Sequence, residues 1–387
     1  MSAQQKIEEY LGAKSSDITK RVLDRIKRYV EIETPSFHAR EIIALSELIE
    51  QELLQIGASV ERIDAPGRGR NIIARFARTK EDARNSAPIL MLAHMDTVHD
   101  IGTLAARPFM VVDDRAIGPG VYDMKAGLAL LVEAMTWHVA NETERRPVTM
   151  LITCDEEVGS HSVRALIDEM ARTAAVVLVP EPCLQHGEVK TARKGVATYT
   201  VKTEGRAAHA GGEPGAAVSA ITELVHQCSR VLALADHSKG TTINVGVIGG
   251  GTATNVIAAN AEAGIDVRLA VEGEFERVDH AMRSLANVHP EAKVTLALAE
   301  SRPPLVRNAA VLAAYAQARE CAAFLGVDLG EGMSGGGSDG SLAAATGAAV
   351  LDGLGPNGGG AHAVDEHILT EDLPFRLALL CRLVERL

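Results

Sequence analysis

The apolar run from Val148 to Cys154 ends directly in three consecutive acids, Asp155, Glu156 and Glu157. The run predicts a β-strand, and open α/β sheets hold their ligands at the C-terminal ends of their strands. Like charges gathered at one buried strand end are costly unless cations or protons neutralise them. The chain must therefore adopt a fold that brings counter-charges, such as metal ions, to this edge.

Four further polar signals follow apolar runs or glycine-rich turns. They are His94 with Asp96 after residues 88–93, Asp123 after the turn 118–120, Glu181 after residues 174–180, and His362 after the last glycine-rich loop. Two histidines and three carboxylates suit zinc or a similar borderline ion, and one shared carboxylate permits a pair of ions about 3.5–4 Å apart. Such a site activates water and polarises a carbonyl, and amide hydrolysis needs both.

Each signal alone has an ordinary alternative. Asp123 could cap the N-terminus of the helix that follows it, a frequent use of aspartate. His94 with Asp96 could lie on a solvated strand end. Five candidates at five successive strand ends favour the metal site. Glu156 and Glu157 are adjacent and so project in different directions, which allows one to bind metal while the other acts as a base.

Strands and helices alternate between residues 59 and 179, and this predicts an α/β fold with a mostly parallel sheet covered by helices. Between residues 194 and 302 the order changes to β-α-β-β-α-β, which is typical of a ferredoxin-like α+β sandwich. The first pattern returns after Pro303. Because 387 residues exceed one ordinary core, we expect a main domain formed by residues 1–193 and 303–387, interrupted by an inserted domain at 194–302.

The composition excludes several classes of function. The formal net charge is −12, so no basic stripe is available to displace counterions from nucleic acid. No apolar segment of signal-peptide type opens the sequence and no run of 18 apolar residues follows, so we expect a cytoplasmic protein without membrane contact. Five scattered cysteines without a C-x-x-C pair argue against disulfides and against a thiolate zinc site.

Five motifs occur in an order that resembles the co-catalytic di-zinc exopeptidase family. They are His94-x-Asp96, Gly-Val-Tyr-Asp123-Met-Lys-Ala-Gly, Asp-Glu156-Glu157-x-Gly-Ser, Glu181-Pro and Ala-His362-Ala-x-Asp-Glu. That family includes glutamate carboxypeptidase, acetylornithine deacetylase and succinyl-diaminopimelate desuccinylase. The motifs span nearly the whole chain, and the family's fold is the α/β catalytic domain with an inserted α+β domain.

The resemblance implies a role for each site residue. His94 and Glu181 would bind one zinc ion, and Glu157 with His362 the other. Asp123 would bridge the two zinc ions of the subunit, for which cobalt or manganese could substitute. Glu156 would be the general base, and Asp96 would orient His94.

The inserted domain resembles the family's dimerisation, or lid, domain. The loop around His209 is similar to one that reaches a neighbouring subunit's active site, and Asn255 and Arg268 resemble the family's carboxylate-binding residues. Their ordinary alternatives are a surface histidine and an arginine on a strand edge. Gly336, in Gly335–Asp339, is a further substrate-binding candidate, and this segment most resembles the glutamate carboxypeptidase branch. Arg302 is another candidate for gripping a substrate carboxylate.

We therefore expect a homodimeric, metal-dependent hydrolase that cleaves the amide bond to a C-terminal carboxylate-bearing amino acid, with glutamate or a related residue released. One alternative is a deacylase for N-acyl amino acids, of the acetylornithine deacetylase or desuccinylase type. An alternative of another class is a catalytically silent dimeric binding protein. Glu156 distinguishes them, because a silent protein could lack the base and this chain retains it.

Overall fold

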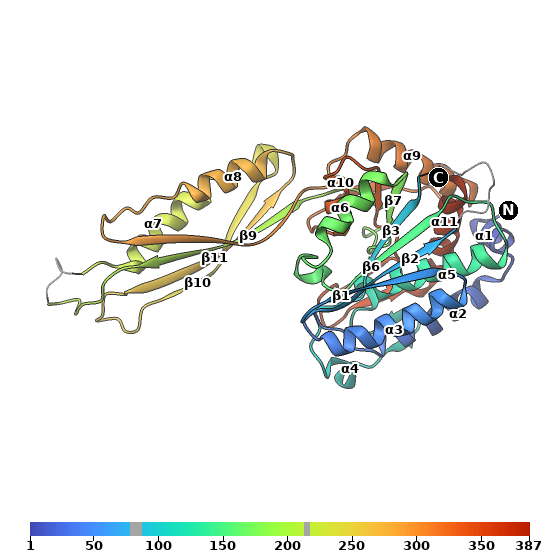
Figure 1. The fold of residues 1–387 in the computed structure, drawn as a ribbon, viewed down its shortest axis with the longest axis horizontal. Helices are drawn as coiled ribbons and strands as arrows, with labels where there is room; N and C mark the ends of the chain where they lie inside the picture. The colour runs from blue at the N-terminus through green and yellow to red at the C-terminus, as the bar shows by residue number, and fades with distance from the viewer. Residues whose placement is uncertain (78–86, 213–216) are drawn as a thin grey trace. The chain divides into compact units, whose positions relative to one another are not determined.

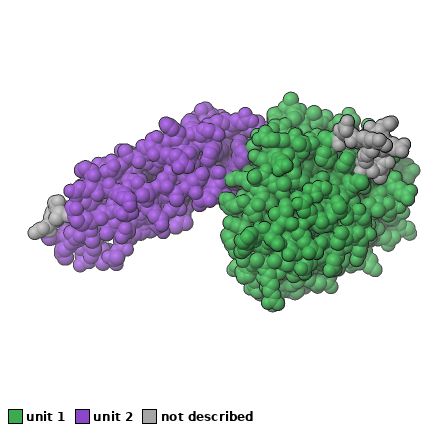
Figure 2. All heavy atoms as spheres, viewed as in Figure 1, with its two compact units in different colours: residues 1–192, 307–334, 338–387 green, residues 193–306, 335–337 purple. Residues whose placement is uncertain are grey.

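The computed structural model describes residues 1–77, 87–212 and 217–387 of the chain. These residues form two compact units (Figures 1 and 2). Unit 1 comprises residues 1–192, 307–334 and 338–387, and unit 2 comprises residues 193–306 and 335–337. Residues 78–86, which belong to the expected main domain, and residues 213–216, which belong to the expected inserted domain, lie outside the described residues.

Unit 1 is built on an eight-stranded sheet. Its strands, in the order β1-β2-β6-β3-β7-β14-β8-β13, are Ser59–Ala65, Gly69–Phe76, Val148–Thr153, Ile89–His94, Val176–Val179, Val350–Asp352, Val189–Arg193 and Glu331–Ser334. The four central strands, β6, β3, β7 and β14, are parallel. β1 pairs antiparallel with β2, β2 with β6, and β8 with β14. The expected α/β class is confirmed. The sheet is mixed rather than mostly parallel, with its parallel strands at the centre.

Helices lie on both sides of this sheet (Figure 1). The helices of unit 1 are α1 (Ala3–Leu11), α2 (Ser15–Val30), α3 (Ala39–Gln55), α4 (Thr103–Ala106), α5 (Ala126–Ala140), α6 (Arg164–Thr173), α9 (Ala309–Phe324), α10 (Asp339–Ala344) and α11 (Leu373–Arg386). Every residue of β3, β6 and β7 is buried, because a sheet covered on both faces exposes neither side of its strands. Helix α5 is apolar around most of its circumference and packs against both α2 and α11.

A small second sheet in unit 1 brings distant loops together. It has the order β15-β16-β5-β4, formed by Gly358–Gly359, His367–Leu369, Arg115–Ile117 and Met110–Val112. Its strands β16 and β5 pair antiparallel, with Ile368 opposite Ala116. This pairing places the loop that carries His362 beside the turn that carries Asp123.

Unit 2 has the predicted β-α-β-β-α-β order. Its elements are β9 (Gly195–Glu204), α7 (Ala220–Leu232), β10 (Thr242–Gly250), β11 (Asn260–Leu269), α8 (Glu274–Arg283) and β12 (Lys293–Arg302). The four strands form an antiparallel sheet in the order β10-β11-β9-β12. Alternate residues of the central strands, among them Tyr199 and Ile265, are buried in this unit's own core, as expected for a sheet with helices on one face. The ferredoxin-like expectation is confirmed.

Within the described residues, no helix has both the length and the apolar composition needed to cross a membrane. All five cysteines are buried and free.

Candidate metal centre

Three neighbouring strands deliver polar side chains to one edge of the main sheet. His94 is the last residue of β3 and lies opposite Thr153, the last residue of β6. Glu156 and Glu157 follow β6 in a short 3₁₀ turn, and Glu181 follows β7. Because β6, β3 and β7 are adjacent and parallel, their carboxyl ends meet at this edge.

Asp123 comes to the same edge from the turn Val121–Lys125 that precedes α5. Its φ and ψ of −113° and 99° are not helical, and α5 begins without a side-chain cap. The alternative in which Asp123 caps this helix is therefore not found. Gly127, in the first turn of α5, allows the helix to pack closely against the segment that follows β7. A Cβ at this position would lie 1.9 Å from the carbonyl oxygen of Pro180.

The side chains form two groups that share Asp123. In the first, His94 Nε2 lies 3.1 Å from Asp123 Oδ1 and 3.5 Å from Glu181 Oε1. In the second, His362 Nε2 lies 3.4 Å from Asp123 Oδ2 and 3.2 Å from Glu157 Oε2. Each oxygen of Asp123 thus faces a different histidine, and the ligand atoms of each group lie within 4.8 Å of one another.

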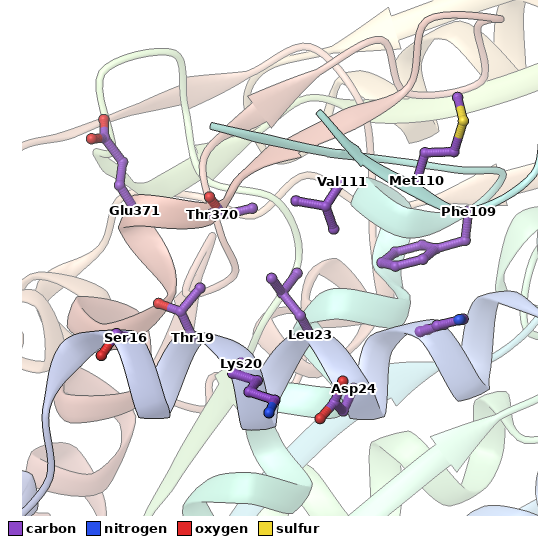
Figure 3. Close-up of a pocket in the computed structure, with 11 residues that line it drawn as sticks. Ser16, Thr19, Lys20, Leu23, Asp24, Phe109, Met110, Val111, Thr370 and Glu371 are labelled. Atoms are coloured by element: carbon purple, nitrogen blue, oxygen red, sulfur yellow. The ribbon is translucent and has the colours of Figure 1, made fainter. Parts of the chain in front are cut away.

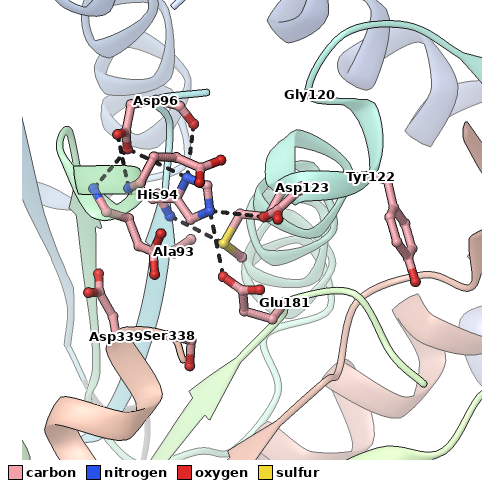
Figure 4. A network of polar contacts seen from close by, with 12 residues as sticks. Ala93, His94, Asp96, Gly120, Tyr122, Asp123, Glu181, Ser338 and Asp339 are labelled. Atoms are coloured by element: carbon pink, nitrogen blue, oxygen red, sulfur yellow. Dashed lines mark hydrogen bonds and ion pairs between the residues drawn. The ribbon is translucent and has the colours of Figure 1, made fainter. Parts of the chain in front are cut away.

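His94 is held in the orientation that a metal ligand needs. Its Nδ1 donates to the backbone carbonyl of Asp96 at 2.9 Å, so the other ring nitrogen, Nε2, points at Asp123 and Glu181 (Figure 4). A hydrogen bond from one imidazole nitrogen fixes which nitrogen presents its lone pair.

The neighbouring carboxylates raise the pKa of both histidines. Burial acts to lower the pKa of His94, but contacts with Asp123, Asp96 and Glu181 outweigh it and hold that pKa well above its usual range. Hydrogen bonds to Asp123 and Glu157 raise the pKa of the half-exposed His362 to about 10. Burial, with the charge of Asp123 beside it, raises the pKa of Glu157. This concentration of negative potential is the condition for cation binding.

The donor set fits divalent metal ions. Imidazole nitrogens and carboxylate oxygens are ligands of zinc and its neighbours. Among the described residues, Glu157 Oε1 is buried and has no hydrogen-bond partner, and an orphaned carboxylate oxygen of this kind is costly unless a cation or proton satisfies it. A set of protein oxygens and nitrogens with one shared carboxylate can hold two ions.

Glu156 lies beside the two groups and belongs to neither. Its backbone N–H donates to Asp96 Oδ1 at 3.0 Å, and the N–H of Glu157 donates to Asp96 Oδ2 at 3.2 Å. The carboxylate of Asp96, also bonded by Ser36 Oγ at 2.7 Å, therefore mainly fixes the turn that carries the two glutamates. Its Oδ1 lies 3.5 Å from His94 Nδ1, farther than the Asp96 carbonyl.

Two acidic residues that sequence reasoning did not select also support the site. Asp339, the first residue of α10, accepts hydrogen bonds from Thr153 and Ser160, which flank the acid turn. Glu366 accepts three backbone N–H groups of the turn that carries Asp123. The only sequence signal for Glu366 was its place four residues after His362.

The candidate substrate-binding residues all belong to unit 2. The loop of His209 pairs with the segment of Asn255, since Ala210 N–H donates to the Asn255 carbonyl at 3.0 Å. Arg268 donates to both oxygens of Asp266, at 2.8 and 2.9 Å, and to the Gly335 carbonyl at 3.4 Å. The Gly336 carbonyl accepts from Arg193 at 3.2 Å. The structure thus places the loop of His209 beside the segment of Asn255, and Arg268 beside the segment of Gly336.

A surface groove elsewhere in unit 1 contains none of the metal-site candidates. It lies between α2 and the strand β4, where Leu23 faces Phe109 and Val111 (Figure 3). Its polar residues, such as Lys20 and Asp24, are exposed or partly exposed side chains of both signs. Among the described residues that line the groove, no catalytic groups converge.

Comparison with known proteins decides the family. The sequence profile of Peptidase family M20/M25/M40 matches residues 90–386. The chain belongs to this family. Carboxypeptidase G2 from Pseudomonas sp. (strain RS-16) is 32% identical over 393 residues, which cover 98% of this chain and 92% of that relative. The resemblance drawn from the five motifs is confirmed, and the chain is a member of a family of metal-dependent peptidases.

Solved structures share the fold over nearly the whole chain. Aminopeptidase PepT from Bacillus cereus ATCC 10987 superimposes with a TM-score of 0.76 at 22% identity and covers 95% of this chain and 98% of its own. The M20 family metallo-carboxypeptidase Sso-CP2 from Sulfolobus solfataricus has a TM-score of 0.72 at 14% identity, covering 94% and 98%. An α/β unit with an inserted sheet unit is therefore common to these peptidases.

Proposed function

We propose that this chain is a cytoplasmic carboxypeptidase that uses two zinc ions to hydrolyse the amide bond to a C-terminal, carboxylate-bearing amino acid, with glutamate or a related residue released. The observation that carries this proposal is that the two carboxylate oxygens of Asp123 face different groups of donors. Oδ1 faces His94 and Glu181, and Oδ2 faces His362 and Glu157. One ion would be held by each group, with Asp123 bridging them. Bound zinc supplies a Lewis acid that lowers the pKa of water and polarises a carbonyl.

Glu156 is the proposed general base. It adjoins the ligand Glu157 but lies outside both ligand groups, and Asp96 fixes its backbone. Its carboxylate would take the proton of the attacking water and pass it to the leaving amine. Asp96 would act as a positioning residue for this turn and, through its carbonyl, for His94.

Four residues of unit 2 are the proposed substrate-binding residues. Asn255, Arg268 and the backbone at Gly336 would bind the C-terminal carboxylate, and His209 would donate a hydrogen bond to the tetrahedral oxyanion. The pairing of Arg268 with Asp266 supports this assignment, because it fixes the guanidinium plane with Nη1 directed at the Gly335 carbonyl, in the segment of Gly336. A planar, oriented guanidinium suits carboxylate recognition.

A homodimer through the inserted domain completes the proposal. Strand β10 lies at an edge of its sheet, and its Val247 and Ile248 are 69% and 59% exposed. Helix α7, which packs beside β10, exposes Ile221 and Val225. A long apolar edge strand tends to pair with another chain, and two-fold symmetry is the commonest way to close such a contact. His209 would then act in the partner's active site.

Five free, buried cysteines support a reducing compartment such as the cytoplasm.

A substrate screen tests the proposal. Purified protein supplied with zinc or cobalt is incubated with dipeptides and N-acyl amino acids that differ in the C-terminal residue, and release of free amino acid is measured. We expect turnover to be highest for substrates ending in glutamate or a related acid and to be abolished by a chelator. Turnover confined to small N-acyl groups, whatever the amino acid, would favour the deacylase, and no turnover of any substrate would favour the binding protein.

A further inference from the structure

The carboxylate of Glu366 lies beneath the turn that carries the proposed bridging ligand, and the peptidase mechanism gives it no role. Its Oε1 accepts the backbone N–H groups of Tyr122 at 2.9 Å and Asp123 at 3.0 Å. Its Oε2 accepts the N–H of Gly120 at 2.8 Å. The side chain is 1% exposed. Both oxygens are thus committed to one short stretch of backbone.

A histidine and an arginine hold this carboxylate in turn. His99 Nε2 lies 2.5 Å from Glu366 Oε2, and His99 Nδ1 lies 3.4 Å from the guanidinium of Arg107. Because arginine can only donate, Nδ1 is the acceptor and Nε2 carries the hydrogen that points at Glu366. The same guanidinium donates to the Ala363 carbonyl at 3.0 Å, one residue after His362.

Glu366 therefore joins the two loops that supply the second group of donors. It belongs to the loop of His362, which turns sharply at Gly360 and at His362 itself, with φ of 72° and 64°. It binds the turn of Asp123 by three hydrogen bonds, and its own carbonyl accepts the N–H of Gly118 at 3.4 Å. These contacts add to the pairing of β16 with β5, which joins the same two segments but includes neither Asp123 nor His362.

We propose that Glu366 is a positioning residue for metal binding, which holds the Asp123 turn and the His362 loop at the separation needed for one ion, with His99 and Arg107 fixing its orientation. This role rests on the proposed function. Groups that hold a metal ligand in place typically contribute about 10–100-fold in metal affinity. Glutamine at this position keeps one acceptor oxygen and turns an NH₂ group toward the remaining donors. The hydrogen bonds between Glu366 and the Asp123 turn are therefore weakened without a large change in side-chain volume.

The test is a zinc titration of Glu366→Gln against a matched variant, with a chromophoric chelator as competitor. Glu223→Gln is the control, because Glu223 in unit 2 is also buried and also accepts two backbone N–H groups, from Val288 at 2.8 Å and His289 at 2.9 Å. We expect the affinity of Glu366→Gln for the more weakly bound of the two zinc ions to fall by about tenfold or more. Glu223→Gln should lose thermal stability and keep wild-type zinc affinity.

Steady-state kinetics and substitutions of His99 test the same role independently. In Glu366→Gln, kcat should fall with little change in KM, and excess zinc should restore part of it. If Glu366→Gln does not fold, the comparison of His99→Leu with His99→Gln replaces it, since only the glutamine keeps an N–H donor for Glu366. We expect weakened zinc binding in His99→Leu and partial rescue in His99→Gln.

The two proposals fail in different ways. Wild-type protein that binds no zinc in these titrations overturns both the proposed function and the role of Glu366. Wild-type protein that binds two ions, together with Glu366→Gln or His99→Leu of unchanged zinc affinity, overturns the role of Glu366 alone.

Discussion

The carboxylate of Asp96 accepts the backbone N–H of Glu156 at 3.0 Å. Its second oxygen accepts the N–H of Glu157, and its backbone carbonyl accepts the ring N–H of His94. One aspartate thus links the end of β3 to the turn after β6 and fixes the orientation of a histidine and two glutamates. Such a fixed frame is what a catalytic group needs in order to be held ready for reaction.

Loss of Asp123 should remove more metal than loss of either histidine. Each oxygen of Asp123 faces a different donor group, whereas His94 and His362 each belong to one. We expect Asp123→Ala to retain fewer ions per chain than His94→Ala or His362→Ala, as measured by elemental analysis of dialysed protein. Two ions per chain in Asp123→Ala would exclude the bridging role.

Substitution of Gly127 by alanine should destabilise unit 1, although alanine favours a helix by about 1 kcal/mol over glycine. A Cβ at Gly127 would lie 1.9 Å from the Pro180 carbonyl oxygen, so α5 would be pushed from the strand end that precedes Glu181. Overpacking of this kind costs about 1–3 kcal/mol or more, measurable by urea unfolding. Gly264→Ala is the control, because its Cβ meets Val247 at an ordinary 3.5 Å. Equal stability of the two variants would contradict the account.

Unit 2 should lose stability in acid through Glu274. Hydrogen bonds from Arg277 and then Thr241 and Lys239, against an opposing contribution from burial, lower the pKa of Glu274 to about 2 in the folded chain. Because the folded pKa lies below the unfolded value of about 4.3, the stabilisation is complete above that value and is lost as the pH falls toward 2. In Glu274→Gln, the urea midpoint should vary less with pH over this window than in wild type. Parallel curves would contradict this prediction.

The dimer and the role of His209 can be tested by mixing two inactive variants. Glu156→Gln chains lack the proposed base, and His209→Ala chains lack the proposed oxyanion donor. If His209 acts in the partner's site, a mixed dimer contains one site with both groups intact, so subunit exchange should restore activity. No recovery after verified exchange would mean that His209 acts within its own chain or has no catalytic part.

The fold class and the positions of the metal-site candidates followed from sequence because the buried strands are short, continuous apolar runs. The polar residues that mark the site lie at the end of β3 or shortly after the ends of β6 and β7, and adjacent parallel strands must end at one edge. Asp123 was less certain, because a capping aspartate gives the same pattern. Its non-helical backbone, set by the glycine-rich turn, distinguished the two.

Other features had no signal that a single sequence can carry. The antiparallel pairing of β1 and β2 at the sheet edge depends on contacts between strands, and the small sheet of β4, β5, β15 and β16 joins segments about 250 residues apart. Glu366 was not predicted as a site residue because its partners are backbone N–H groups, which every residue but proline possesses. Gly335–Gly337 belong with unit 2 in space, because arginines of that unit bind their carbonyls.

The proposed mechanism requires that Glu156 transfers protons beside a metal pair that it does not bind. The most direct test is the turnover of Glu156→Gln, measured on the best substrate of the screen with metal content determined on the same sample. We predict wild-type metal content, a wild-type unfolding transition, and a loss of activity of roughly 10²–10⁴-fold or more. Near-normal turnover in a variant with full metal content would contradict the account.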